Sequence, residues 1–179
     1  MVDAEMSSLD VNDGELLSLG WVVIRQGRVE LSTAEHLLLK PRESVGESAV
    51  IHQLRDCELE QGLDGSTVLT RLLSVAEGRV LVFHHAPVDL SFLNRLCQEL
   101  SGAPLLLPCV DTLEIEKQRL LRREQPLSDG ALRLASCCAR YNLPASPAHN
   151  ALTDALATAQ LLLAQIAHKG KDTRLADLR

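Results

Sequence analysis

The class of fold is indicated by residues 80–100, VLVFHHAPVDLSFLNRLCQEL, in which the apolar pattern changes midway. Residues 80–83 are a short, continuous apolar run, which is typical of a strand buried on both faces. After a turn at residues 84–87, apolar side chains recur at helical spacing over residues 88–100. A buried strand that leads directly into an amphipathic helix predicts an α/β fold.

The flanking sequence extends this pattern in both directions. Residues 16–24 and 29–39 are typical of a hairpin with its turn at Gln26 and Gly27, and residues 64–76 have the spacing of a helix. Downstream, the sequence predicts one further buried strand and three helices, over residues 105–110, 112–123, 128–141 and 150–168. A hairpin followed by alternating strands and helices predicts a mixed sheet covered by helices.

The start of the chain leaves two interpretations open. Asp3 and Glu5 resemble the end of a first strand, yet only two residues precede Asp3, and a strand of ordinary length has about five. Either the first strand is truncated to a short stub, or the chain is a fragment or a mis-started version of a longer protein. We favour the second interpretation.

The composition excludes several classes of protein. A chain of 179 residues, 46% of them hydrophobic, suffices for one globular domain that folds without a disulfide or a metal. Aromatic residues make up 2% of the chain, which excludes a base-stacking surface of the RRM or OB kind, because such surfaces need exposed rings. With 18 basic and 24 acidic residues, the net charge of −6 does not indicate a basic surface for nucleic acid.

The cysteines and the apolar runs bear on the cellular compartment. The five cysteines show no Cys-x-x-Cys spacing, so we expect reduced, buried thiols rather than a disulfide framework or a zinc ribbon. No apolar run approaches the roughly 18 residues of a membrane span, and no basic segment of an export signal precedes one. The sequence therefore predicts a cytoplasmic protein that does not act at a membrane.

Four acids and a histidine occupy positions that a sheet and its helices can bring together. Asp3 and Glu5 share one face of a strand, because side chains alternate with period two. Asp89 follows a buried strand and enters a helix, and Asp154 lies in the first turns of the last helix, five residues after His149. Acids at i and i+2 on one face repel each other, and a hard divalent cation with oxygen ligands relieves that repulsion.

Each of these residues also has an ordinary structural explanation. An Asp-x-Glu pair near a terminus is common at solvated strand ends, and Asp89 is suited to cap a helix. A histidine before a helix, such as His149, is more often a surface residue than a base. The occurrence of all five residues at strand ends and helix starts nevertheless favours a common site.

Three segments carry a resemblance to a known family. They are Asp3-Ala4-Glu5-Met6, then Val82-Phe83-His84-His85-Ala86-Pro87-Val88-Asp89 with Phe92 and Leu93, and then His149-Asn150-Ala151-Leu152-Thr153-Asp154-Ala155. In this order they resemble the three exonuclease motifs of the DEDDh family, which includes the proofreading epsilon subunit of bacterial DNA polymerase III, ribonuclease T and oligoribonuclease. The likeness extends over nearly the whole chain.

The resemblance implies a fold and an activity. The expected fold is ribonuclease H-like α/β, with helices flanking a mixed five-stranded sheet over residues 1–168 and a loose polar tail over residues 169–179. The expected activity is that of a 3′-to-5′ exonuclease with two Mg²⁺ or Mn²⁺ ions, which hydrolyses phosphodiester bonds at nucleic-acid 3′ ends and releases 5′-mononucleotides.

The same resemblance assigns roles to the five motif residues. Asp3, Glu5 and Asp154 are expected to ligate the ion that activates water, and Asp3 and Asp89 to hold the second ion. His149 is expected to accept the proton of the attacking water, for which an imidazole with a pKa near 6.5 is well suited.

Contacts to the terminal nucleotide are implied for a further set of residues, namely Glu47, His52, Met6, Ser7 and His85. The family often continues with Thr-Thr-Gly after the glutamate, where this chain has Met6-Ser7-Ser8. His85 replaces the usual Asn, and Val88 replaces the common Phe. Because these departures leave every expected metal ligand intact, we expect the chemistry to be retained, whereas the choice between DNA and RNA stays open.

The basic residues of the expected helix 112–123 have two interpretations. They either follow a nucleic-acid backbone or form a solvated helix face balanced by neighbouring acids, and the second is favoured. The basic residues are Lys117, Arg119, Arg122 and Arg123, and the acids are Glu114, Glu116 and Glu124.

We expect the partner to be a single-stranded DNA or RNA 3′ end, and the chain to act free-standing, as a homodimer, or as a domain of a larger protein. A proofreading subunit of a DNA polymerase is the first alternative, although residues 169–179 are short for a polymerase-binding tail. An inactive nucleic-acid-binding relic of the fold is disfavoured, because no expected acid or histidine is missing.

Overall fold

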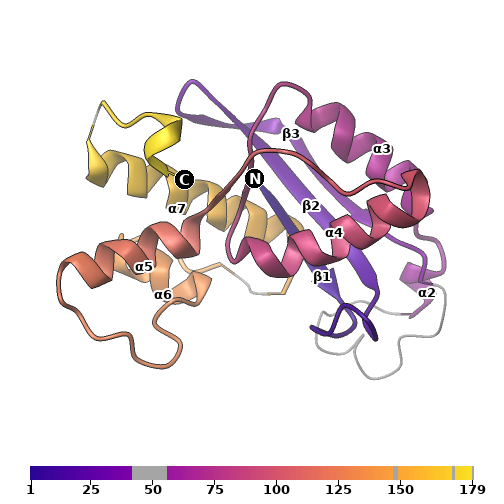
Figure 1. Cartoon of the computed structure of the whole chain (residues 1–179), viewed down its shortest axis with the longest axis horizontal. Coiled ribbons are helices and arrows are strands. Elements are labelled where there is room, and N and C mark those ends of the chain that lie inside the picture. Colours follow the sequence, from indigo (N-terminus) through magenta and orange to yellow (C-terminus); the bar gives the residue numbers. More distant parts are fainter. Residues whose placement is uncertain (42–55, 147–148, 171, 179) are drawn as a thin grey trace.

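The computed structural model describes residues 1–41, 56–146, 149–170 and 172–178. Three strands come first along the chain, and the helices follow with two further strands between them (Figure 1). The strands are β1 (Val2–Met6), β2 (Leu16–Arg25), β3 (Arg28–Leu38), β4 (Leu81–Phe83) and β5 (Cys109–Asp111). The helices are α2 (Asp56–Leu59), α3 (Gly65–Ala76), α4 (Ala86–Ser101), α5 (Thr112–Arg122), α6 (Leu134–Arg140) and α7 (Ala151–Lys169), and a 3-10 turn, η1 (Leu175–Leu178), follows them.

The strands form two hydrogen-bonded groups within the described residues. β1, β2 and β3 pair antiparallel in that order, and β4 pairs in parallel with β5. β1 and β4 are in contact, so the two groups form one mixed layer. The predicted hairpin is confirmed, and Gln26 and Gly27 both have a positive φ at its turn, as a tight hairpin turn requires.

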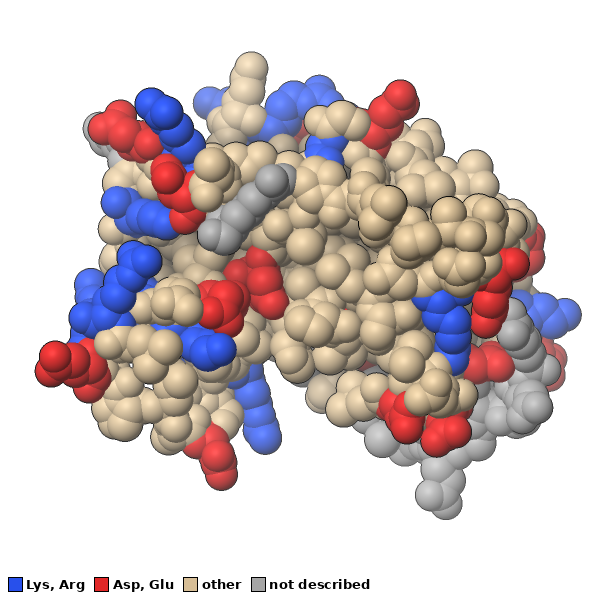
Figure 2. Space-filling view, in the orientation of Figure 1, with Lys and Arg blue, Asp and Glu red and all other residues tan. Residues whose placement is uncertain are grey.

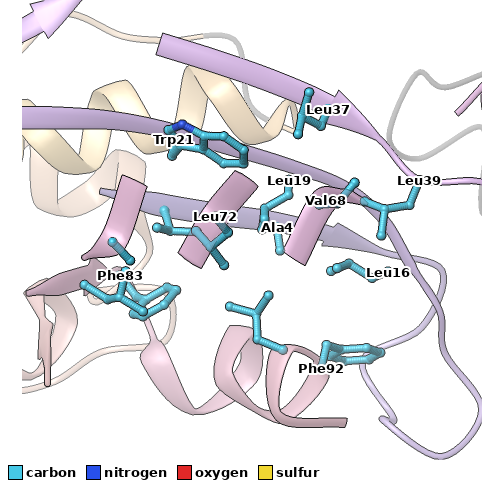
Figure 3. Close-up of a cluster of buried hydrophobic side chains, with 14 of the residues drawn as sticks. Ala4, Leu16, Leu19, Trp21, Leu37, Leu39, Val68, Leu72, Phe83 and Phe92 are labelled. Carbon is cyan, nitrogen blue, oxygen red and sulfur yellow. The ribbon is translucent and has the colours of Figure 1, made fainter. Parts of the chain in front are cut away.

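Helices cover both faces of this layer. On one face, Trp21 and Phe83 lie in a core closed by α3 and α4 (Figure 3). On the other face, α7 packs the small side chain of Ala155 against Val22 and Val82. Because neighbouring residues of a strand point to opposite faces, Trp21 and Val22 belong to different cores. The predicted class, a mixed α/β fold with flanking helices, is confirmed.

The strand predicted over residues 105–110 is wrong in its extent. The structure places strand pairing at Cys109–Asp111, and Leu106 is 86% exposed rather than buried. Pro104 and Pro108 bracket the preceding stretch, and proline has no N–H to donate to a ladder. The backbone N–H of Leu105 instead donates to the side chain of Asn94 at 2.8 Å.

The helix predicted over residues 128–141 is shorter than expected, because α6 begins at Leu134. Gly130 adopts a left-handed conformation with φ of 73°, which a continuous helix does not allow. The residues before α6 therefore form turns, and these turns contribute to the cavity described below.

Both ends of the chain differ from expectation. β1 has five residues, so it is a strand of ordinary length with Asp3 and Glu5 inside it rather than at its end. In the segment expected to be a loose tail, Leu178 of η1 is buried in the same core as Val22 and Val82. Lys169 at the end of α7 also donates a hydrogen bond to the backbone carbonyl of Asp177.

Two further expectations concern thiols and membranes. Cys97, Cys137 and Cys138 are buried free thiols, as predicted, whereas Cys109 is a half-buried free thiol and the side chain of Cys57 lies outside the described part of the chain. Within the described residues, the helices are too short or too polar to cross a lipid bilayer.

Candidate active site

The strand β1 presents its two acids to α7. Val2 and Ala4 point into the core under α3 and α4, so Asp3 and Glu5, which alternate with them, point to the opposite face. The shared face predicted for Asp3 and Glu5 follows directly from this alternation.

A glycine in β2 lets α7 approach these acids. Gly20 pairs with Asp3 in the sheet, and a Cβ atom on Gly20 would lie 2.3 Å from the backbone nitrogen of Leu152 in the first turn of α7. No side chain fits in that space, so the helix begins directly against the sheet and carries Asp154 to β1. We did not predict a role for Gly20, although a glycine inside an apolar strand is a known signal of close backbone approach.

Asp3, Glu5 and Asp154 converge on one point. One carboxylate oxygen from each lies within 4.8 Å of those of the other two. Such a set of oxygen donors fits a hard divalent cation. Residues from the two ends of the sequence thus form one cluster, which is the arrangement expected for the first metal ion.

Asp89 reaches the same region from α4. Its Oδ1 atom accepts a hydrogen bond of 3.0 Å from the backbone N–H of Ala4, and Asp89 is 5% exposed. Since Ala4 lies between Asp3 and Glu5, this bond holds the Asp89 carboxylate at the edge of β1 beside the cluster. Asp89 lies outside the set of three whose oxygens are within 4.8 Å of each other.

Burial and mutual repulsion raise the pKa of these carboxyls. Burial, followed by the charges of Asp89, Asp154 and Glu5, places the pKa of Asp3 well above its usual value. Burial and then Asp154 raise the pKa of Glu5 to about 7, and burial foremost raises the pKa of Asp89 to about 7. Burial also raises the pKa of Asp154. In the part of the chain that the structure describes, no lysine or arginine forms an ion pair with Asp3, Asp89 or Asp154.

A further acid, Asp111, positions Asp89 through the backbone. The carboxylate of Asp111 accepts hydrogen bonds from the backbone N–H groups of His85 at 2.9 Å and Ala86 at 3.0 Å, and it also caps α5 through Leu113. These bonds fix the turn at which α4 begins, and therefore the place of Asp89 within its first turn. Sequence analysis missed this role, although an acid between a buried strand and a helix is a recognisable N-cap.

His149 lies at the start of α7, beside Asp154. It is exposed and has a left-handed backbone with φ of 68°. Its backbone N–H donates to Oδ2 of Asp154 at 3.0 Å, and Asn150 caps the helix by accepting from the N–H of Thr153. The turn before α7 therefore fixes the backbone of His149 and the Asp154 carboxylate relative to each other.

The cluster opens into a cavity of about 1020 Å³. Asp3, Asp154 and His149 line it, together with His85, which was predicted to contact substrate, and the turns at residues 127–133. This volume lies at the upper end of the range of ordinary ligand sites.

The remaining predicted substrate residues are placed less favourably. Met6 is buried in the core under α3 and α4, and the Ser7 hydroxyl accepts a hydrogen bond from the N–H of Glu15 at 2.8 Å; neither residue lines the cavity. Glu47 and His52 lie outside the described residues. Substrate contacts by these four residues stay predictions.

Comparison with known proteins agrees with the family resemblance of the sequence. The family model RNase_T, described as an exonuclease, matches residues 1–162. The chain is 30% identical over 164 residues to a DNA polymerase III of PolC type from Thermotoga petrophila, and 24% identical over 163 residues to that of Ureaplasma parvum. These matches cover 91% and 89% of this chain but only 11% of each relative, so the chain spans a small part of the length of these relatives.

Solved structures show the same fold. Escherichia coli exonuclease I in complex with a dA16 oligonucleotide matches with a TM-score of 0.76 and 14% identity, over 91% of this chain and 39% of that one. Exonuclease X in complex with 5′ overhanging duplex DNA matches with a TM-score of 0.73 and 16% identity, over 99% and 95% of the two chains. The predicted ribonuclease H-like architecture is therefore confirmed.

Proposed function

Because the chain belongs to the RNase_T exonuclease family, we propose that it is a 3′-to-5′ exonuclease that removes nucleoside 5′-monophosphates from nucleic-acid ends. The observation that carries this proposal is the convergence of Asp3, Glu5 and Asp154 within 4.8 Å of one another. The fold brings them together at the edge of a cavity that has room for a nucleotide.

Two divalent cations are part of the proposal, because the carboxylates of Asp3, Glu5 and Asp154 fit one such ion and Asp89 lies beside them. Asp3, Glu5 and Asp154 would hold the first ion, and Asp3 and Asp89 the second. When bound, Mg²⁺ or Mn²⁺ lowers the pKa of a coordinated water and neutralises charge on the phosphate that is attacked. The carboxylates would contribute oxygen ligands to the ions. Their burial and mutual repulsion raise their pKa values, and a bound cation would relieve that repulsion.

His149 is the proposed general base. His149 lines the cavity, and its imidazole would accept the proton from the attacking water at a ring nitrogen. The bond from the His149 backbone to Asp154 keeps the base close to the metal ligands. An exposed ring also allows the proton to pass to solvent, so that the base is regenerated.

The cavity is proposed to hold the terminal nucleotide. His85 and the turns at residues 127–133 line the same cavity as Asp3 and Asp154. The E. coli exonuclease I structures with oligonucleotides favour a single-stranded end as the substrate. Glu47, His52, Met6 and Ser7 stay secondary candidates for contacts to the same nucleotide.

Proofreading within a larger DNA polymerase is a second candidate function. It is favoured by the likeness to the PolC-type polymerases, of which this chain spans 11%. If it is correct, the chain removes mismatched primer ends faster than matched ends, since a frayed end enters a single-strand site more readily. A degradation assay on a primer with a matched or mismatched 3′ end tests this candidate.

The main proposal is tested with an oligonucleotide that carries a fluorophore at its 5′ end. With Mn²⁺ or Mg²⁺, we expect a ladder that shortens from the full length, and nucleoside 5′-monophosphates as the released product. EDTA abolishes the reaction, as does Asp3→Asn, and His149→Ala slows it strongly. Parallel reactions with RNA, single-stranded DNA and duplex DNA define the substrate class.

Glu77→Gln is the matched control, because Glu77 is an exposed acid that does not line this cavity. It should degrade the oligonucleotide at the wild-type rate. Equal trimming by the wild type and by Asp3→Asn would overturn the assignment of the site. Release of the labelled nucleotide as the first product would overturn the proposed direction.

A further inference from the structure

One wall of the active cavity has little buried surface of its own. This wall consists of the turns at residues 127–133, which line the cavity together with Asp3 and Asp154. Residues 127–129 and 133 are exposed, and residues 130–132 are half-buried. In the space-filling view, α5, α6 and the connection between them project from the rest of the molecule at the lower left (Figure 2). A segment with so few buried side chains depends on hydrogen bonds to keep its position.

Side chains from two sides hold the backbone of these turns. From α6, Arg140 and Cys137 donate to the carbonyl of Ala131. From the sheet, Nε2 of His84 lies 2.8 Å from the carbonyl oxygen of Leu132, across 48 residues of sequence. His84 directly follows β4, so its bond ties the turns to the sheet, whereas the bonds from α6 stay within the projecting part.

Both nitrogens of the His84 ring have partners, which fixes the orientation of the ring. A carbonyl can only accept, so Nε2 carries the hydrogen that is donated to Leu132. Nδ1 lies 2.8 Å from Oγ1 of Thr112, the buried first residue of α5. Burial foremost lowers the pKa of His84 and favours the neutral ring, whose Nδ1 accepts the hydrogen of this hydroxyl. When the ring is protonated, the hydroxyl has the carbonyl of Phe83 at 3.0 Å as its acceptor, so the bond to Leu132 is kept in both states.

The side chain of His84 is separate from the contacts that place the acids. The turn before α4 is fixed by Asp111, which accepts from the backbone N–H groups of His85 at 2.9 Å and Ala86 at 3.0 Å. That turn starts the helix that carries Asp89. Removal of the His84 ring therefore frees the turns at residues 127–133 and leaves the acids in place.

We propose that His84 is a positioning residue, whose ring fixes the turns at residues 127–133 as a wall of the cavity and thereby sets how tightly the terminal nucleotide binds. This inference rests on the proposed exonuclease function and adds a residue that acts on affinity through Leu132. A wall contributes equally to binding of the substrate and of the transition state, so its loss raises KM and leaves kcat nearly unchanged.

Hydrogen–deuterium exchange and steady-state kinetics of His84→Ala test the proposal. In EDTA, we expect the amides of Ala131 and Arg133, which donate within the turns at 3.0 and 3.1 Å, to exchange at least about fivefold faster than in the wild type. With saturating Mn²⁺, KM for a single-stranded oligonucleotide should rise about tenfold, whereas kcat should stay within about threefold. His84→Gln, whose amide can donate to the carbonyl of Leu132, should recover part of the affinity.

Thr112→Val is a second variant, which carries the test if His84→Ala does not fold. It keeps the shape of the buried side chain but removes the hydroxyl at Nδ1, so the ring loses one of its two partners. We expect faster exchange in the turns and a smaller rise in KM than for His84→Ala. Thr112→Val should add nothing further in the His84→Ala background, because both changes act through the same ring. An equal effect of Thr112→Val in both backgrounds would overturn the proposal.

His168→Ala is the matched control, since His168 is an exposed histidine on α7 that does not line the active cavity. It should change neither the exchange nor KM. Unchanged exchange in the turns of His84→Ala would overturn the proposal, as would a fall in kcat at constant KM. If the wild type degrades no oligonucleotide, the proposed function fails, whereas the exchange measurement, which needs no substrate, still decides whether His84 holds the turns.

Discussion

Two sites in this molecule contain buried acid side chains, and they differ in whether arginine side chains balance the acidic charge. Glu116 on α5 has a fully buried side chain, and it receives Arg119 at 2.6 Å, Arg140 at 3.0 Å and the hydroxyl of Tyr141 at 2.8 Å. Burial alone would raise the pKa of Glu116, but the bonds from these residues outweigh it and hold the pKa below its usual value. This group joins α5 to α6.

The acids Asp3, Glu5, Asp89 and Asp154 lie in the opposite situation. Among the described residues, no arginine or lysine forms an ion pair with Asp3, Asp89 or Asp154. The pKa of each of the four acids lies above its usual value. The comparison teaches how to separate a structural acid from a functional one. Glu116 is paired within the chain, whereas Asp3, Asp89 and Asp154 have no lysine or arginine ion pair among the described residues, as the proposed binding of a cation requires.

The largest effect that separates the two groups is expected for Asp154→Asn. It retains an oxygen for the His149 backbone N–H but removes the charge of a proposed metal ligand. We expect kcat to fall by at least about 1000-fold, or about 4 kcal/mol, while the melting temperature of the metal-free protein stays level or rises. Kinetics with saturating Mn²⁺ and calorimetry in EDTA measure the two quantities. A loss of activity that merely follows a loss of stability would remove the distinction between the groups.

Gly20→Ala tests how the acid cluster is assembled. The added methyl meets the α7 backbone at 2.3–2.6 Å, so it displaces Asp154 from β1. We expect about 100-fold lower kcat and about 1–3 kcal/mol lower stability. Gly65→Ala is the control, because its methyl meets only the flexible end of Leu96. Equal kinetics for Gly20→Ala and Gly65→Ala would show that the approach of α7 does not govern the site.

Glu116→Gln is the counterpart in the paired group. It leaves two arginines partly buried without their acid, so we expect a loss of about 3 kcal/mol in the free energy of unfolding. Activity per folded molecule should stay within about threefold of the wild type. Urea unfolding measures the stability, and Glu114→Gln, which removes a more exposed pair with Lys117, should cost at most about 1 kcal/mol. A larger effect on kcat than on stability would contradict the structural role.

The pH dependence of stability should carry opposite signs for the two groups. The pKa values of Glu5 and Asp89 rise on folding from 4.5 and 3.8 to about 7. The stability they contribute is therefore complete below their unfolded pKa values and is lost as the pH rises through 7. The pKa of Glu116 is lowered on folding, so its contribution is present above its unfolded value of 4.5 and is lost on acidification.

Melting temperatures in EDTA between pH 6 and pH 8 measure this effect. We expect the wild type to lose on the order of 1–2 kcal/mol toward pH 8, and Mg²⁺ to restore more stability at pH 8 than at pH 6. Glu5→Gln should flatten the slope, whereas Glu116→Gln should keep it. A metal-free protein that becomes more stable toward pH 8 would contradict the raised pKa values.

Much of the site was readable because its residues lie in local patterns. The alternation of β1 predicts that Asp3 and Glu5 share a face, and a strand followed by a helix predicts where Asp89 lies. The terminal strand of residues 105–110 and the helix of residues 128–141 were placed less accurately. Pro104, Pro108 and the left-handed Gly130 interrupt the pattern there, and their effects depend on backbone conformation rather than on hydrophobic spacing.

The sequence by itself determined the class of fold, because periodicity is a property of the chain alone, and the resemblance of its three motifs to a known family indicated the candidate site residues. The tertiary structure decided what no spacing encodes: that Gly20 admits α7, and that Asp111 holds the turn before α4. It also decided that Glu116 is paired with arginine, whereas no lysine or arginine of the described residues forms an ion pair with Asp3, Asp89 or Asp154. Those outcomes depend on distances between segments remote in sequence. The charge and burial of a carboxylate are fixed only when such segments meet.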